Sequence, residues 1–390
     1  MVLGKLKVAI VHDFLLWMGG AERCLEGLCE IFPNADIYTL FYSKGKLSKT
    51  IEKHKIYPSF LQRFPFHEKY YRYLYTLMPS AVEKFDLSCY DLVISSSWCV
   101  AKGALVPFTV PHISYMYTPM RYAWDLHDLY FGQSSDYSLL LRSLIAPQLT
   151  YIRMWDFSSS DRADFFIADS KYVARRIKHT YKRDSNVIYP PVDVEKFKIG
   201  KNRQEYYLMV TSFEPSKRVD LAVDAFNVLG LNLKIVGRSG RGERRLKSRA
   251  NPNIEFLGYV EEKKLIELYS EARALIVPGI EDFGISALEA SASGTPVIAY
   301  AKGGNLESVL PVNPLVVSGI SGSPTGVFFY QPTSHSLLDA VELFRRNDRI
   351  DSWDREAMRR HAMKFSKQNY IQNMKKEISE DMDKFKSNIE

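Results

Sequence analysis

Two glutamates stand eight residues apart in the stretch from Pro278 to Glu307. Glu281 lies in a loop that follows an apolar run, Ala272 to Val277, and Glu289 lies inside the small-residue helix that we predict from Ile285 to Ser293. Backbone N–H groups at the start of a helix suit a phosphate, and ionised carboxylates accept hydrogen bonds from hydroxyl groups. The pattern therefore predicts a site for a ligand with a diphosphate centre and polyhydroxyl ends, such as a nucleotide sugar.

A simpler interpretation gives these two carboxylates no ligand. Glu281 would then only complement the dipole of the helix, and Glu289 would face solvent. The neighbours of Glu289 in the sequence are mostly apolar, among them Leu288 and Ala290, and an unpaired charge in such surroundings would be costly. Both interpretations stay open at this point.

The elements around the two glutamates predict an α/β fold with parallel sheets. The run from Ala272 to Val277 and the run from Val297 to Tyr300 are typical of buried strands, one on each side of the predicted helix. A loop after the second strand holds Gly303 and Gly304. Because ligands of open parallel sheets bind at the carboxyl ends of the strands, we expect these loops to line one site.

Two other strand ends carry candidate groups. Gly19 and Gly20 open the helix after a first strand at Lys7 to His12, and such a pair either lets a ligand approach the backbone or forms an ordinary turn. Lys217 and Arg218 follow a strand at Tyr206 to Ser212 and precede a helix. A cation at a helix start opposes the dipole unless an anion binds there, which favours a phosphate contact over a solvated lysine.

The Glu-x7-Glu spacing, with Asp-Phe-Gly inside it and Gly-Thr-Pro-Val after it, resembles the retaining family-4 glycosyltransferases of the GT-B fold. The run TPMRYAWD from Thr118 to Asp125 resembles the mannosyltransferase branch that builds bacterial and archaeal surface polysaccharides. The resemblance implies an α/β fold of two Rossmann-like domains whose parallel sheets face each other across a cleft. It places an acceptor-binding domain at 1–188, a nucleotide-sugar donor domain at 189–368, and a helix at 369–390 that crosses back to the N-terminal domain.

The same resemblance implies retaining, metal-independent hexosyl transfer without a cofactor, with mannose moving from GDP-mannose to a glycan or lipid-linked glycan. It assigns the transferred sugar to Glu281, the ribose to Glu289 and the leaving phosphates to Lys217. Catalysis would rest on Glu281 and Lys217, and Tyr117 and Arg121 would contact the acceptor or sugar. The residues implied in donor binding are Gly19, Gly20, Ser212, Arg218, Phe283, Gly284, Ile285, Glu289, Gly303 and Gly304.

Three positions depart from the family pattern. Trp98 and Tyr117 stand where relatives often carry histidine, and Ser212 stands where they carry arginine. Tyrosine is a neutral donor at pH 7 and cannot replace an imidazole. Two alternatives therefore stay open: a sugar-nucleotide epimerase or hydrolase of the same fold, and a catalytically silent subunit that scaffolds polysaccharide assembly.

Composition sets the remaining expectations. A chain of 390 residues with 46% hydrophobic residues and a net charge of +7 favours two globular domains. Residues 44–84 combine basic and aromatic side chains, which predicts either peripheral membrane contact or an ordinary amphipathic helix pair. Nothing resembles a nucleic-acid module. We expect a cytoplasmic protein at the inner face of the cell membrane, and no run of 18 apolar residues spans a bilayer.

Two further patterns are given structural interpretations. The four cysteines lack a C-x-x-C pair, so we expect ordinary core thiols in a reducing compartment. The D-x-D at Asp381 to Asp383 falls in a helical tail, and we interpret it as a solvated face and not as a metal site.

Overall fold

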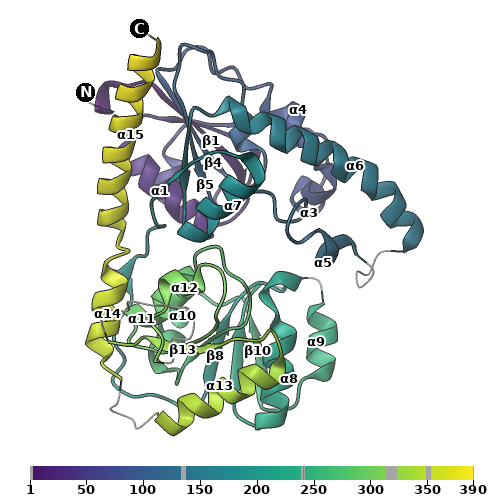
Figure 1. The fold of residues 1–390 in the computed structure, drawn as a ribbon, viewed down its shortest axis with the longest axis vertical. Helices are drawn as coiled ribbons and strands as arrows, with labels where there is room; N and C mark the ends of the chain where they lie inside the picture. The colour runs from purple at the N-terminus through teal and green to yellow at the C-terminus, as the bar shows by residue number, and fades with distance from the viewer. Residues whose placement is uncertain are drawn as a thin grey trace. The chain divides into compact units, whose positions relative to one another are not determined.

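The computed structural model describes residues 3–132, 138–238, 240, 242–312, 323–347 and 353–389. The chain divides into two compact units, each described here by itself (Figure 1). Unit 1 comprises Met1–Pro191 and Gln368–Glu390, and unit 2 comprises Val192–Lys367.

Unit 1 is built on a seven-stranded, wholly parallel sheet in the order β3-β2-β1-β4-β5-β6-β7. Its central strands are buried almost throughout, because helices cover both faces of a parallel sheet and leave no solvated face. The strands are β1 (Val8–Leu15), β2 (Asp36–Tyr42), β3 (Ile56–Pro58), β4 (Leu92–Ser97), β5 (His112–Met116), β6 (Phe165–Ala168) and β7 (Asn186–Val187).

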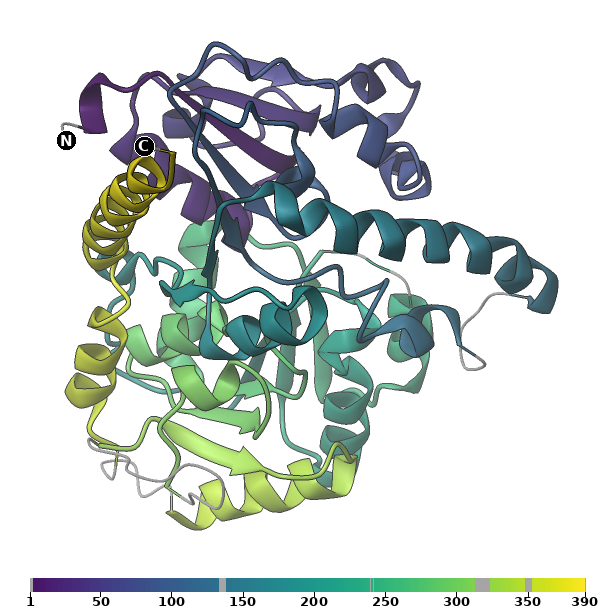
Figure 2. The ribbon, with the colours of Figure 1, turned by 45° about the horizontal axis from the view of Figure 1, so that its top comes forward.

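The helices of unit 1 differ widely in length. The longest one within 1–191, α6, extends well away from the sheet in both ribbon views (Figures 1 and 2). The helices are α1 (Gly20–Ile31), α2 (Lys49–Glu52), α3 (His67–Tyr70), α4 (Met78–Val82), α5 (His127–Phe131), α6 (Leu139–Ser158) and α7 (Lys171–Tyr181).

A C-terminal helix, α15 (Lys367–Ile389), packs against α1 in unit 1 (Figure 1). Tyr370 is buried there, and its hydroxyl donates to the carbonyl of Cys24 at 3.4 Å. A Cβ at Gly27 would lie 2.5 Å from the Tyr370 ring, so α1 needs glycine at the crossing. The C-terminal helix is therefore part of the core of unit 1.

Unit 2 repeats the design with six parallel strands in the order β10-β9-β8-β11-β12-β13. The strands are β8 (Tyr207–Val210), β9 (Leu233–Val236), β10 (Ile254–Gly258), β11 (Leu275–Val277), β12 (Val297–Tyr300) and β13 (Gly326–Phe329). The helices are α8 (Val219–Leu229), α9 (Glu243–Arg249), α10 (Glu262–Glu271), α11 (Ile285–Ala292), α12 (Asn305–Ser308), α13 (Ser334–Asn347) and α14 (Arg355–Met363). The expected α/β class with two Rossmann-like parallel-sheet domains is confirmed.

Both sheets reverse their strand order at one place. In unit 1 the reversal lies between β1 and β4, and in unit 2 it lies between β8 and β11. Loops on the two sides of such a switch point lead in opposite directions and leave a crevice at the carboxyl ends of the strands. Loops that follow these four strands are therefore the first place to look for a ligand site.

Three expectations need correction. Residues 44–84 are not an amphipathic helix pair but a series of short elements, α2, β3, α3, α4 and two 3₁₀ turns at Phe60–Arg63 and Tyr71–Leu74. Asp381 is buried on α15 and paired with Lys384, so it does not belong to a solvated face. Cys89 is exposed, whereas the other three thiols are buried. In the part of the chain that the structure describes, no helix is both long and apolar enough to cross a bilayer.

Candidate active site

The switch point of unit 2 brings together the two residues predicted to be catalytic. Lys217 ends a short 3₁₀ turn after β8, and Glu281 lies in the loop after β11. Because β8 and β11 are neighbours in the sheet, these loops meet, and Lys217 Nζ lies 2.6 Å from Glu281 Oε2. The side chains remain 27% and 17% exposed, so the ion pair is open to a ligand.

Two glycines hold the loop after β12 against the loop that carries Glu281. Gly304 N–H donates to the Glu281 carbonyl at 2.8 Å, and Gly303 forms an isolated parallel bridge with Glu281. A Cβ on Gly304 would lie 2.3 Å from Phe283 Cα, and one on Gly303 would lie 2.4 Å from the Glu281 carbonyl oxygen. Any side chain at these glycines would push the two loops apart, so Gly303, Gly304 and Phe283 form one packed unit beside the ion pair.

The helix that follows, α11, starts at Ile285 without a side-chain cap. Gly284 precedes it with φ of 100°, a conformation that disfavours other residues. Asn305 Oδ1 and Ser308 Oγ are buried without a hydrogen-bond partner, and a Cβ at Gly284 would lie 3.4 and 2.9 Å from them. The first turn of α11 thus has backbone donors and two unsatisfied side-chain oxygens close together, a polar environment that favours a ligand.

Glu289 lies further along α11 and is buried, so the interpretation that it faces solvent is wrong. Its Oε2 accepts a hydrogen bond of 2.8 Å from the hydroxyl of Tyr269 on α10. A buried carboxylate needs such donors because it has lost its water. The partner, Tyr269, was not predicted, since a contact between two helices leaves no mark in the local sequence.

The two remaining predicted donor residues of unit 2 lie close to Lys217. Ser212 is half-buried after β8, and its carbonyl accepts from the hydroxyl of Thr211 at 3.0 Å. Arg218 has φ of 50° and turns back on Asp220, to which its Nε and Nη2 donate at 3.1 and 2.9 Å. The guanidinium of Arg218 is therefore engaged within its own turn, and Lys217 is the cation that faces Glu281.

In unit 1 the predicted residues gather at the ends of β1, β4 and β5. Gly19 caps α1 and Gly20 begins it, next to Glu22. The hydroxyl of Tyr117 donates to the carbonyl of Ala21 at 2.9 Å and lies 2.8 Å from Ser96 Oγ. Tyr117 therefore ties β5 and β4 to the glycine turn.

Unit 1 also contains a buried carboxylate, Asp13, that was not predicted from the sequence to have a role. It is fully buried near the end of β1 and accepts four backbone N–H groups from residues 98–101, at 2.6 to 2.8 Å. Burial raises the pKa of the Asp13 carboxyl, and the four hydrogen bonds oppose that rise. Trp98, in one of the expected histidine positions, supplies the first of these N–H groups and packs edge-on against His12. The switch point of unit 1 is thus closed by the protein's own carboxylate.

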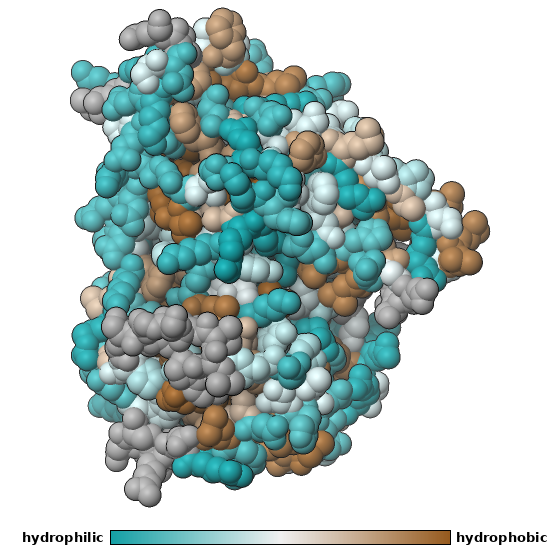
Figure 3. All heavy atoms as spheres, in the orientation of Figure 1, coloured by the Kyte–Doolittle hydropathy of each residue, from teal (hydrophilic) through white to brown (hydrophobic). Residues whose placement is uncertain are grey.

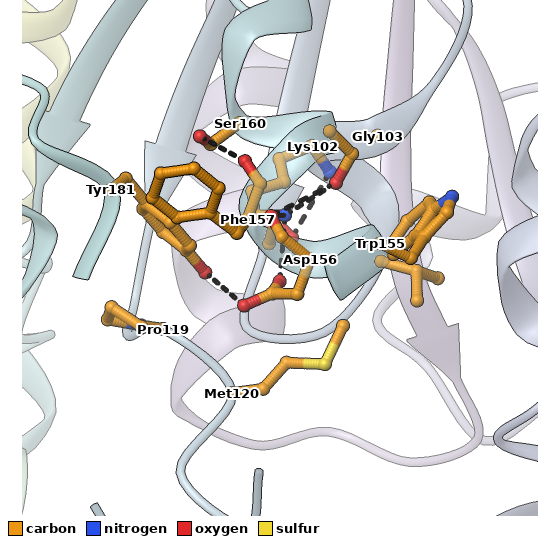
Figure 4. A network of polar contacts seen from close by, with 12 residues as sticks. Lys102, Gly103, Pro119, Met120, Trp155, Asp156, Phe157, Ser160 and Tyr181 are labelled. Carbon is orange, nitrogen blue, oxygen red and sulfur yellow. Dashed lines mark hydrogen bonds and ion pairs between the residues drawn. The ribbon is translucent and has the colours of Figure 1, made fainter. Parts of the chain in front are cut away.

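The TPMRYAWD segment of unit 1 is held by a buried polar network (Figure 4). Trp124 Nε1 and the Tyr181 hydroxyl both donate to Asp156 Oδ2, at 2.7 and 2.8 Å. Lys102 Nζ lies 2.8 Å from Asp156 Oδ1, and both side chains are completely buried. Arg121, the predicted acceptor contact, lies half-buried in the same segment, and its carbonyl accepts from the N–H of Leu126. The network is bonded internally and positions the segment.

Within the described residues, no group of three histidine, cysteine, aspartate or glutamate side chains could hold a metal ion. This includes the D-x-D at Asp381, whose first carboxylate is paired with Lys384 Nζ at 3.1 Å. Burial raises the pKa of Asp381.

Each half of the chain matches a protein family model. Residues 18–196 match "Glycosyltransferase Family 4", and residues 192–365 match "Glycosyl transferases group 1". Among curated proteins, the chain is 31% identical over 159 residues to an uncharacterized glycosyltransferase of Methanocaldococcus jannaschii, covering 39% of this chain and 44% of that protein. It is 30% identical over 162 residues to the O-antigen chain mannosyltransferase RfbU of Salmonella typhimurium, covering 39% and 46%. The matched stretch therefore spans under half the length of each of these two relatives.

Solved structures share the fold over nearly the whole chain. The Anabaena protein Alr3699/HepE, solved in complex with UDP-glucose, has a TM-score of 0.69 and 17% sequence identity. The superposition covers 96% of this chain and all of that one. At this identity the likeness shows the fold, which is that of the two-domain GT-B structures.

Proposed function

We propose that this chain, which belongs by both its halves to the family-4 glycosyltransferases of GT-B fold, transfers a hexosyl group from a nucleotide sugar to a hydroxyl group. The donor is GDP-mannose, and the acceptor is a glycan or lipid-linked glycan. One observation carries the proposal: Lys217 and Glu281 form a partly exposed ion pair beside the uncapped start of α11, at the switch point of unit 2.

The donor diphosphate binds at this helix start. Backbone N–H groups at Gly284, Ile285 and Gly303 face the phosphate oxygens, and Lys217 exchanges its carboxylate partner for a phosphate. Fixed donors of this kind stabilise the negative charge that develops as the bond between sugar and phosphate breaks. The reaction needs no metal ion, because these groups supply the positive field.

The two glutamates bind the polyhydroxyl ends of the donor. Glu281, once released by Lys217, accepts hydrogen bonds from the transferred sugar, and Glu289 binds the ribose. The leaving phosphate oxygen removes the proton of the attacking hydroxyl on the same face of the sugar, which retains the anomeric configuration. This route requires no protein nucleophile.

Unit 1 supplies the acceptor side. Tyr117 and Arg121 lie after the carboxyl end of β5, where ligands of parallel sheets bind. The glycine turn at Gly19 and Gly20 follows β1 and contributes to donor binding. A lipid-linked acceptor fits a cytoplasmic enzyme at the inner face of the membrane, held there through residues 44–84. The mannosyl assignment is supported by the name of the Salmonella relative, and a nucleotide-sugar donor by the ligand of the Anabaena structure.

Donor turnover in the full chain tests the proposal. We expect release of GDP from GDP-mannose in the presence of a mannosylated lipid acceptor, unchanged by a chelator. Lys217→Ala and Glu281→Ala should each lower turnover at least about 100-fold, as loss of an electrostatic contact to the transition state does.

The matched control is Lys264→Ala. Lys264 also pairs with a glutamate of unit 2, Glu267, at 3.2 Å, but this pair lies on the exposed side of α10. It should leave turnover unchanged. Unaltered turnover in Lys217→Ala refutes the role of that lysine. GDP release that needs no acceptor indicates a hydrolase, and no turnover with any donor indicates a silent scaffold.

The base of the donor is tested separately by thermal unfolding with GDP, UDP and ADP. A ligand that binds the folded state stabilises it by RT ln(1 + [L]/Kd). We expect GDP to raise the melting temperature most, and a larger shift with UDP would correct the donor.

A further inference from the structure

Helix α6 of unit 1 presents an apolar, uncharged face to solvent along its whole length. Leu140, Leu144, Pro147, Tyr151 and Met154 recur at intervals of three and four residues, so they form one stripe on the helix. All five are exposed, and Leu140 is 73% accessible. The opposite face carries Leu149, Ile152 and Asp156, which are buried against unit 1. A helix at the surface of a soluble domain normally carries polar residues on its outer face. The apolar outer face of α6 is therefore typical of a surface that binds a partner.

The apolar end of α6 projects from unit 1. In the ribbon views the first turns of α6 extend beyond the sheet and the other helices of unit 1 (Figures 1 and 2). The space-filling view shows hydrophobic residues gathered at that tip (Figure 3). A projecting helix about 30 Å long can lie in the interfacial region of a bilayer along its length.

The charges around the stripe are basic. Helix α6 has no acidic residue between Leu139 and Trp155, and its two arginines there, Arg142 and Arg153, lie on the side of the helix away from the stripe, where Arg153 donates to the carbonyl of Ala123 at 3.2 Å. The basic side chains beside the stripe belong to the neighbouring segment 63–77, in which Arg63, Lys69 and Arg72 are exposed. The one acidic residue of this segment, Glu68, is paired with Lys46 at 2.7 Å.

The stripe continues onto that neighbouring segment. The hydroxyl of Tyr75 donates to Gln148 Oε1 of α6 at 2.6 Å, which fixes the two elements side by side. The segment adds exposed aromatic side chains, Phe66, Tyr70 and Tyr73. Aromatic rings and basic side chains around an apolar helix face are the composition of a helix that lies in the interface of a bilayer.

We propose that α6 is a membrane-docking helix, and that its stripe from Leu140 to Met154 enters the acyl boundary of a bilayer with anionic lipids. The exposed side chains of Arg63, Lys69 and Arg72 in the neighbouring segment then contact the lipid headgroups. A second copy of the chain fits this face poorly, because pairing two stripes would bring the basic residues of segment 63–77 of both copies together. The proposal concerns α6 and is independent of the sugar that is transferred.

Sedimentation of the full chain with vesicles tests the proposal without any donor or acceptor. The vesicles contain phosphatidylcholine with about one-third phosphatidylglycerol, and pure phosphatidylcholine serves as comparison. We expect binding to the anionic vesicles that survives in part at about 0.5 M NaCl, because apolar insertion is not screened by salt. Leu140→Glu should weaken binding at least tenfold, and Leu140→Glu with Leu144→Glu should reduce it to background.

Val228→Glu is the matched control. Val228 is 76% exposed on α8 of unit 2, so the same charge is introduced at an equally exposed apolar position away from α6. This variant should bind vesicles as the wild type does. Because Leu140 is exposed, both variants should keep the circular dichroism and melting temperature of the wild type.

Three results would overturn the proposal. One is wild-type protein that fails to bind anionic vesicles. Another is Leu140→Glu protein that binds as tightly as wild type, which would leave the contact to the basic residues of 44–84 alone. The third is a lipid-free wild-type dimer, seen by sedimentation velocity, that dissociates in Leu140→Glu. That result would assign the stripe to self-association.

Discussion

The two units each contain a close lysine–carboxylate pair, and the pairs differ in their surroundings. In unit 1, Lys102 Nζ lies 2.8 Å from Asp156 Oδ1, with both side chains completely buried. In unit 2, Lys217 Nζ lies 2.6 Å from Glu281 Oε2, with both side chains partly exposed. The buried carboxylate also accepts from Trp124 and Tyr181, so every strong partner is internal. Similar chemistry therefore serves structure in one unit and remains accessible to a ligand in the other.

The switch points of the two sheets differ in the same sense. In unit 1 the carboxylate of Asp13 accepts the four N–H groups that follow β4, and no solvent reaches it. In unit 2 the equivalent position holds Lys217 and Glu281 beside the uncapped start of α11. A Rossmann-like unit can thus close its own anion site with a side chain or leave it open. The difference teaches that two units of the same fold can differ in whether the polar groups at their switch points are satisfied internally.

Breaking the buried pair should have the largest effect. Lys102→Met leaves the Asp156 carboxylate buried without its cation, and we expect the free energy of unfolding to fall by about 3–5 kcal/mol. Lys217→Met should change it by less than about 1 kcal/mol, because solvent screens the partly exposed pair. Urea unfolding of both variants measures the difference. Equal losses in the free energy of unfolding would mean that the two ion pairs stabilise the fold to the same extent.

Acid should weaken unit 1 through a buried histidine. Burial lowers the pKa of His112 from 6.5 to about 4, while Nδ1 faces the Arg162 carbonyl and Nε2 the Ser95 hydroxyl. The folded state keeps His112 neutral, so its share of stability is complete above pH 6.5 and is lost as the pH falls towards 4. The full loss is about 3 kcal/mol, from 2.5 pH units at about 1.36 kcal/mol each.

Urea unfolding between pH 4 and 7 measures this loss. His112→Gln should flatten the profile relative to wild type, because the group that must take up a proton on unfolding is gone. His335→Gln replaces an exposed histidine of α13 and should leave the profile unchanged. A wild-type slope that survives in His112→Gln would assign the acid sensitivity elsewhere, for example to His361, whose pKa burial also lowers.

The smallest effect concerns the buried carboxylate of unit 2. Tyr269→Phe removes the hydroxyl that donates to Glu289 and should cost about 1–2 kcal/mol in the free energy of unfolding. Tyr259→Phe, at an exposed position of the same unit, should cost nothing measurable. Excess GDP should recover part of the Tyr269→Phe loss if Glu289 binds the ribose, since a ligand adds stability by mass action. No loss in Tyr269→Phe would show that Glu289 is satisfied without it.

Much of the fold could be predicted because it depends on local patterns. The run Val297–Tyr300 is apolar from end to end, as a strand buried on both faces must be, and it forms β12 with those bounds. The helix predicted at Ile285 to Ser293 is α11, Ile285–Ala292. The helix pair predicted for residues 44–84 was wrong. The short helices and turns there depend on packing against the cluster that contains Phe41 and Leu61, and periodicity in the sequence does not reveal such packing.

The candidate site was predicted in part for the same reason. The glycines at 303 and 304 and the spacing of Glu281 and Glu289 are local features, and each residue lies where a strand or helix places it. Tyr269, Asn305, Ser308 and Asp13 were missed, because their roles arise from contacts between segments far apart in the chain. Arg218 was predicted to bind the donor, but the structure shows a local contact instead. Its guanidinium donates to Asp220, two residues further along the same turn.

The sequence by itself determined which residues could meet an anion and a sugar, and that they stand at the ends of apolar strands. Only the tertiary structure decided that Lys217 and Glu281 touch, since the order of strands in the sheet, and not their order in the chain, makes β8 and β11 neighbours. Only it decided that Lys102, a surface residue by type, is buried, and that the leucines of α6 are not. The reason is physical: chemical type is a property of one residue, whereas burial is a property of everything packed around it.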